Sequence, residues 1–152
     1  MGTFRILNIG ALSANKFWGE TERTDRTISA TCTLLDYGGQ RLIVDPSPHP
    51  EELAVMLFAR AGLRPDAIDG VFLTHFHGDH RFGLELFPDA TWMMTGSGLQ
   101  VWRERAPQDH ALVARFVTAE GRLPEGVALR PSPGHTPYLC ALQAATPWGT
   151  LV

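Results

Sequence analysis

The chain has 152 residues, of which 44% are hydrophobic and 19% are charged. This composition is typical of a soluble globular protein and excludes a disordered chain. The net charge of 13 − 16 = −3 gives no indication of binding to nucleic acid or to an anionic membrane. A chain of this length can bury a substantial core, so we expect residues 1–152 to form a single domain.

The amino-terminal segment and the cysteines indicate where the protein resides. Residues 1–5 lack the long apolar core of a signal peptide, and no apolar run approaches the length of a membrane span. Cys32 and Cys140 do not form a disulfide framework, and we expect both to be small buried apolar residues in a reducing compartment. The sequence therefore predicts a cytoplasmic protein.

Hydrophobic periodicity and turn residues predict alternating strands and helices. Gly38 and Gly39 indicate the turn of a β-hairpin, Gly62 ends the first helix, and Ser97 is expected to cap a later helix. In chain order, the predicted elements are a strand at residues 4–9, a hairpin of strands 27–37 and 40–44, a helix at 51–61, a strand at 68–74, a short helix at 80–87, a strand at 90–95, helices at 97–105 and 108–116, a strand at 127–130, and a hairpin of 138–145 with residues from 150 onward. This order favours a layered α/β (α+β) domain.

A cluster of metal-binding residue types directly follows the predicted strand 68–74. His75, His77, Asp79 and His80 all lie within the segment HFHGDH, which holds three of the six histidines of the chain. Neutral imidazole and carboxylate are the usual ligands of a catalytic divalent metal. The cysteines lie far away in the sequence, which favours a catalytic over a structural metal site. The alternative is a histidine-rich surface loop or helix start that binds no metal.

The spacing within this cluster limits how the side chains can meet. On a helix, His75 and His77 would point to opposite sides, whereas in a loop leaving a strand they can converge on one ion. Asp79 and His80 are adjacent, which favours a second, neighbouring metal position for this pair. Gly78 permits a tight turn between the two pairs.

Three segments carry a resemblance to a known family. Residues 74–80, with the sequence THFHGDH, resemble the HxHxDH signature of the metallo-β-lactamase superfamily. Residues 42–46 are similar to the strand of that family that ends in an aspartate, here Asp45, and residues 133–137 are similar to its GHTP segment. The resemblance extends from about residue 27 to the carboxyl terminus and implies a metallo-β-lactamase-like αββα sandwich.

The resemblance also implies the metal ligands. His75, His77 and His135 would form the first zinc site, and Asp79 and His80 would contribute to a second one. The family completes its second site with an aspartate and a histidine downstream of the GHTP segment, but no Asp, Glu or His follows His135. We therefore expect a C-terminally truncated domain that binds one zinc through the three histidines, with a second zinc possible only through a half-site.

The truncation predicts an incomplete second sheet. Such a sheet would leave an unpaired edge and an apolar face in water, so we expect either a homodimer that covers this face or a marginal fold. The residues expected to be involved are Leu139, Ala141, Leu142, Trp148, Leu151 and Val152. A lesser departure from the family is Arg81-Phe82-Gly83, where small residues are common.

The leading functional hypothesis is a zinc-dependent hydrolase that acts on a small-molecule substrate. A zinc-bound hydroxide would attack an ester, thioester, lactone, amide or phosphoester, and Asp79 would orient the nucleophile or transfer a proton. One alternative is a mononuclear iron sulfur dioxygenase, since imidazole and carboxylate also bind iron. Another is a truncated metal-binding remnant without activity.

The remaining candidates each have two interpretations. Asp45 is expected either to support the metal loop through hydrogen bonds or to cap a turn. His49 is expected to face solvent rather than the mouth of the site. Phe17, Trp18 and Trp102 could line a cleft, but core packing is favoured for each.

Overall fold

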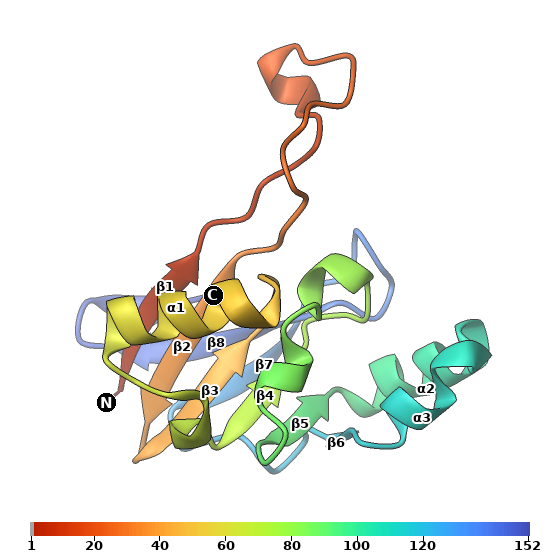
Figure 1. Cartoon of the computed structure of the whole chain (residues 1–152). Coiled ribbons are helices and arrows are strands. Elements are labelled where there is room, and N and C mark those ends of the chain that lie inside the picture. Colours follow the sequence, from red (N-terminus) through yellow and green to blue (C-terminus); the bar gives the residue numbers. More distant parts are fainter. Residues whose placement is uncertain (1) are drawn as a thin grey trace.

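The structure, a computed structural model, describes residues 2–152 and has three layers (Figure 1). Helices cover one face of a six-stranded sheet, and a three-stranded sheet packs on its other face. The α-helices are α1 (Pro50–Ala61), α2 (Gly96–Arg105) and α3 (His110–Val113). Short 3-10 turns lie at Lys16–Trp18, Pro65–Ala67, Gly78–His80, Leu84–Leu86 and Pro107–Asp109. The predicted mixed α/β class is confirmed.

The larger sheet follows chain order from one edge to the other. Its strands are β1 (Thr3–Asn8), β2 (Cys32–Tyr37), β3 (Gln40–Val44), β4 (Gly70–Phe72), β5 (Thr91–Met94) and β6 (Val117–Thr118). The first three strands pair antiparallel and the remaining pairs are parallel. The smaller, antiparallel sheet consists of β7 (Val127–Pro131), β8 (Cys140–Thr146) and β9 (Gly149–Leu151).

Strand β4 is buried on both faces, and this explains why its sequence is continuously apolar. Val71 packs in the core between the sheet and the helices, whereas Phe72 packs in the core between the two sheets. The second core also receives Leu142 from β8, and the Tyr37 hydroxyl donates a hydrogen bond of 2.6 Å to the Ala145 carbonyl. A rigid, doubly covered strand therefore delivers the loop that begins at Leu73.

Two predicted helices differ from the structure. Residues 80–87 form 3-10 turns instead of a helix, because the Gly83 amide donates to the Pro46 carbonyl at 2.7 Å and draws this segment onto residues 46–48. Residues 108–116 are α-helical only over α3, preceded by the 3-10 turn at Pro107–Asp109, and residues 117 and 118 already join the sheet as β6. The cap of α2 is Thr95 and not Ser97, because the Thr95 hydroxyl accepts from the Gly98 amide.

Residues 9–31 form an arm between β1 and β2 that extends away from the body of the molecule (Figure 1). Core packing was expected for Phe17 and Trp18, and this prediction is wrong. Both lie at the end of the arm, where their side chains are 99% and 72% exposed. Trp102, in contrast, is fully buried as expected.

The outer face of the smaller sheet carries no helix within residues 2–152. The prediction that Leu142 lies on an exposed face is wrong, because its side chain points toward the larger sheet and is only 7% exposed. Exposed apolar surface in this region comes from Trp148, at 84%, and from Val152. None of the described helices is long and apolar enough to cross a membrane.

Candidate metal centre

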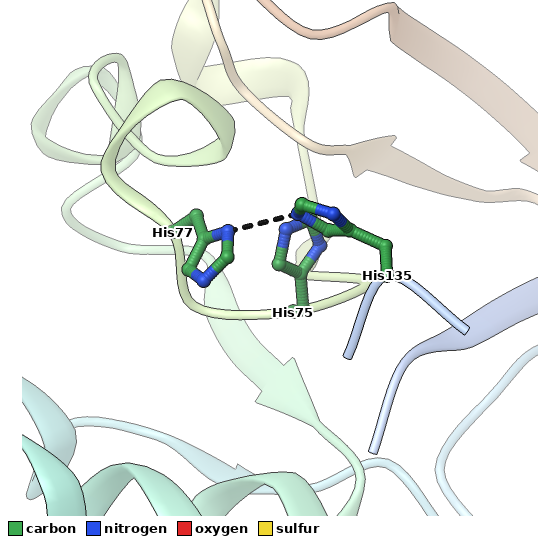
Figure 2. A group of neighbouring side chains, drawn as sticks. All are labelled: His75, His77 and His135. Atoms are coloured by element: carbon green, nitrogen blue, oxygen red, sulfur yellow. Dashed lines mark hydrogen bonds between the residues drawn. The ribbon is translucent and has the colours of Figure 1, made fainter. Parts of the chain in front are cut away.

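Two loops bring the histidines together. The first follows β4 at the carboxyl end of a parallel strand and carries His75 and His77, and the second joins β7 to β8 and carries His135. The Cys140 amide donates to the Thr74 carbonyl at 3.1 Å and connects the two loops. Figure 2 shows the three imidazole rings turned toward one another. The loop arrangement predicted for the HFHGDH segment is therefore present.

The geometry of this three-histidine group fits a divalent metal ion. One nitrogen from each of His75, His77 and His135 lies within 4.8 Å of the others. His135 Nε2 and His77 Nδ1 are 3.0 Å apart, close to the separation of about 3.3 Å that follows from Zn–N bonds of about 2.0–2.1 Å in a tetrahedron. His75 Nε2 is buried and has no hydrogen-bond partner. A buried nitrogen of this kind requires a partner, and a metal ion supplies one.

Burial also sets the protonation state of these histidines. His75 is only 1% exposed, and burial together with the neighbouring His80, His77 and His135 lowers its pKa to about 3. Burial and the nearby His135 likewise lower the pKa of His77. Both rings are therefore neutral at pH 7, which is the form that binds a metal. His135 is exposed, so the group opens to solvent on its side.

Asp79 and His80 are arranged differently. His80 Nε2 lies 3.9 Å from Asp79 Oδ2, whereas His80 Nδ1 is hydrogen-bonded to Asp45 Oδ2 at 2.9 Å. Burial alone would lower the pKa of His80, but the hydrogen bond and the charges of Asp45 and Asp79 outweigh it and raise the pKa. In the described part of the chain, no third histidine, cysteine or carboxylate completes a metal-binding group with this pair.

Asp45 supports the loop, as one of its two interpretations predicted. Its carboxylate accepts hydrogen bonds from the Thr74 amide at 2.9 Å and the Thr74 hydroxyl at 2.8 Å, in addition to the bond with His80. Its backbone has φ = 50°, a left-handed conformation that Asp tolerates better than most residues. Asp45 thus holds Thr74 and His80 directly, and it reaches the candidate metal group only through the Thr74 hydroxyl, which lies 3.2 Å from His75 Nδ1.

A family model of the metallo-β-lactamase superfamily matches residues 26–147. The chain belongs to this superfamily. Metallo-β-lactamase superfamily proteins include hydrolases of small molecules, and they bind divalent metals, commonly zinc. A search of curated proteins gives no match.

Solved structures of the metallo-β-lactamase fold resemble the chain. A candidate metallo-β-lactamase from Thermotoga maritima has a TM-score of 0.68 and 22% identity, with 98% of this chain and 75% of that chain covered. The hydrolase AbOPH of the β-lactamase superfamily has a TM-score of 0.65 and 20% identity, with 89% and 58% covered. AidC, a dizinc quorum-quenching lactonase, has a TM-score of 0.63 and 16% identity, with 79% and 53% covered. The chain thus spans little more than half the length of the last two.

Some residues around this candidate metal centre were not singled out in the sequence. The buried Ser47 hydroxyl bonds the Asp79 carbonyl and accepts from the Ala30 amide at 2.6 Å, so it ties the base of the arm to the metal loop. Its position between two prolines was the only signal. His49 is exposed and stacks on Phe82 with ring centres 4.8 Å apart, as expected for a solvent-facing residue.

Proposed function

We propose that the chain is a metal-dependent hydrolase that holds one zinc ion with His75, His77 and His135. The observation that carries this proposal is the buried, unpartnered Nε2 of His75, which faces ligand nitrogens of the other two histidines. Zinc prefers three such nitrogens with an open fourth position in catalytic sites.

The residues around the ion have separate tasks. A zinc ion held here would act as a Lewis acid and lower the pKa of water from 15.7 to about 7. His75 and His77 are neutral and offer lone pairs without first losing a proton. The half-exposed Asp79 carboxylate can accept a hydrogen bond from the attacking water and take up its proton. His80, fixed by Asp45, lies within ion-pair distance of Asp79 and restrains that carboxylate.

The substrate class is a small molecule with an ester, thioester, lactone, amide or phosphoester bond. AidC is described as a quorum-quenching lactonase, and a second solved neighbour is described as a quorum-quenching N-acyl homoserine lactone hydrolase. Lactones therefore come first among the substrates to be tried with this chain.

Hydrolysis of a panel of chromogenic substrates tests the proposal. We expect metal-free protein to be inactive toward a lactone, a thioester, a β-lactam and a phosphodiester, and zinc to restore turnover of at least one of them. His75→Ala should abolish that turnover, whereas Arg115→Ala, whose side chain contacts Trp92 and the Pro88 carbonyl, should preserve it. Zinc-independent turnover would contradict the proposal, as would bound iron with thiol-dependent oxygen uptake.

Two further expectations accompany this function. We propose that the exposed end of the smaller sheet, at Trp148 and Val152, is covered in a homodimer. We also propose a cytoplasmic location, because Cys32 and Cys140 are free and buried. Burial and the charge of Asp45 raise the pKa of Cys32 to about 12, so this thiol is neutral and unsuited to bind metal.

A further inference from the structure

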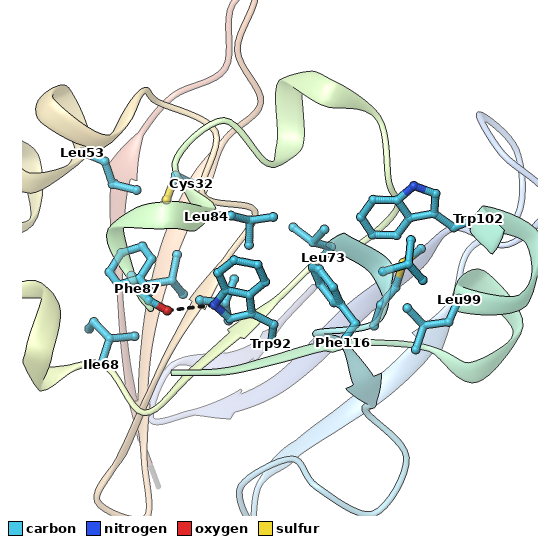
Figure 3. Close-up of a cluster of buried hydrophobic side chains, with 14 of the residues drawn as sticks. Cys32, Leu53, Ile68, Leu73, Leu84, Phe87, Trp92, Leu99, Trp102 and Phe116 are labelled. Atoms are coloured by element: carbon cyan, nitrogen blue, oxygen red, sulfur yellow. Dashed lines mark hydrogen bonds between the residues drawn. The ribbon is translucent and has the colours of Figure 1, made fainter. Parts of the chain in front are cut away.

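Three aromatic rings form a parallel stack behind the three-histidine group. Phe76, which lies between His75 and His77 in the chain, has its ring centre 5.1 Å from that of Tyr138 and 5.3 Å from that of Trp102. The planes deviate by only 2° and 11°. Tyr138 follows His135 by three residues, so the stack connects both ligand loops to α2. Figure 3 shows Trp102 anchored in the core beside Leu99 and Phe116.

Arg81 locks this stack from one side. Its Nε donates to the Phe76 carbonyl at 3.0 Å, its Nη2 donates to Asp109 Oδ2 at 2.8 Å, and its guanidinium lies over the Trp102 ring at 5.1 Å. Asp109 Oδ2 also accepts from Trp102 Nε1 at 2.9 Å. The four residues Phe76, Arg81, Trp102 and Asp109 therefore form a closed set of contacts around one half-buried guanidinium.

The position of Phe76 makes this set relevant to the metal ligands. His75 and His77 face His135, whereas the intervening Phe76 packs its ring on Tyr138 instead. Any movement of the Phe76 backbone changes the spacing of its two neighbours. Tyr138, at the other end of the stack, restrains the loop of His135 in the same way.

We propose that the Tyr138–Phe76–Trp102 stack, locked by Arg81 and Asp109, sets the separation of His75 and His77 from His135 and thereby the metal affinity. These are positioning residues, and the inference depends on the proposed metal site. Partners that orient metal ligands typically contribute 10–100-fold to affinity, by a rough general range. Arg is suited to this task because its planar fork can hold a carbonyl, a carboxylate and an aromatic face together.

A second arginine provides a matched control. Arg115 lies over the Trp92 ring at 3.7 Å and donates to the Pro88 carbonyl at 3.1 Å. It combines the same kinds of contact, an aromatic face and a carbonyl, but it touches neither ligand loop. A purely structural role for such an arginine would affect Arg81→Ala and Arg115→Ala alike.

Cobalt titration of metal-free protein, followed by visible absorbance, measures the affinity directly. We expect Arg81→Ala to bind Co²⁺ about 10–100-fold more weakly than the parent chain. Arg81→Lys should show an intermediate loss, because an ammonium group cannot reproduce the three contacts at once. Arg115→Ala should bind Co²⁺ as the parent does, although both alanine variants should lose some stability in thermal unfolding of the metal-free protein.

Other outcomes distinguish the inference from the metal site itself. If Arg81→Ala binds Co²⁺ as tightly as the parent chain, or if Arg115→Ala loses as much Co²⁺ affinity as Arg81→Ala does, the proposed role of the stack is wrong. Either result leaves the metal site itself intact. A parent chain that binds no Co²⁺ overturns both. Should Arg81→Ala not fold, Arg81→Lys and Asp109→Asn decide the matter by the same titration.

Discussion

The two halves of the HFHGDH segment differ in how their polar atoms are engaged. In the first half, the metal-facing nitrogens of His75 and His77 have no bond to the supporting protein framework, and His75 Nε2 has no partner at all. In the second half, His80 Nδ1 is held by Asp45, whose carboxylate also binds Thr74. Residues of the same type, a few positions apart, are therefore available to a ligand in one half and serve the framework in the other.

This difference assigns the two halves separate energetic roles. The histidine group contributes little to the stability of the metal-free protein, because the buried His75 Nε2 is desolvated without a compensating hydrogen bond. The Asp45–Thr74–His80 network stabilises the loop whether or not a metal is bound. We expect zinc to stabilise variants in the second half but not variants in the first half.

The largest effect is expected from Asp45→Ala. The substitution leaves the Thr74 amide and His80 without their acceptor at a buried position, so the free energy of unfolding should fall by about 3–5 kcal/mol. Urea unfolding of metal-free protein measures this loss. The half-exposed Asp79 provides the control, since Asp79→Asn should change stability by no more than about 0.5 kcal/mol. Equal losses in the two variants would remove the distinction between framework and ligand.

The order of stability of two histidine variants, His80→Ala and His77→Ala, should reverse when zinc is added. Without metal, the free energy of unfolding of His80→Ala should fall by about 1–3 kcal/mol, because the buried Asp45 carboxylate loses a hydrogen-bond partner. The free energy of unfolding of His77→Ala should hardly change. Zinc at 100 times its Kd should stabilise the parent chain and His80→Ala by about 2.7 kcal/mol. His77→Ala should gain nothing in the same thermal melts. A full zinc response in His77→Ala would contradict the assignment.

The two halves should also differ in pH dependence without metal. The pKa of His75 is lowered to about 3 by burial and by neighbouring histidines, so the unfolded chain takes up its proton first. Stability should therefore fall below about pH 6.5, by about 1.4 kcal/mol per pH unit from this residue. The pKa of His80 is raised, because its hydrogen bond and the charges of Asp45 and Asp79 outweigh burial. Its contribution is complete below pH 6.5 and is lost as pH rises through the folded pKa.

Urea unfolding between pH 5 and 8 separates these two contributions. His75→Gln should flatten the dependence below about pH 6.5, and His80→Gln should flatten it above that value. A His75→Gln variant with the parent slope in the acidic range would show that this imidazole is not held neutral.

The smallest effect on stability is expected far from both halves. Trp148 is exposed at the turn between β8 and β9, so Trp148→Ser should alter the free energy of unfolding of a monomer by no more than about 0.5 kcal/mol. If this end of the smaller sheet forms the homodimer, the variant should elute as a monomer in size-exclusion chromatography. A parent chain that is monomeric at all concentrations would exclude the homodimer.

The sequence predicted the ligand side of this comparison better than the framework side. His75, His77 and His135 could be identified because each follows a strand end and belongs to a short motif. Support of the metal loop by Asp45 was one of two open interpretations, but its partners Thr74 and His80 depend on contacts between segments that lie far apart in the chain, which no local pattern encodes. The exposed Phe17 and Trp18 were misjudged for a similar reason, since apolar residues predict a core only where the chain folds back on them.

Zinc analysis of protein purified without added metal tests the central claim most directly. The parent chain and Asp79→Ala should each contain about one zinc per chain, and His135→Ala should contain none. Two zinc ions in the parent chain would show that Asp79 and His80 form a complete site. A parent chain without zinc would show that the three histidines do not form a metal centre.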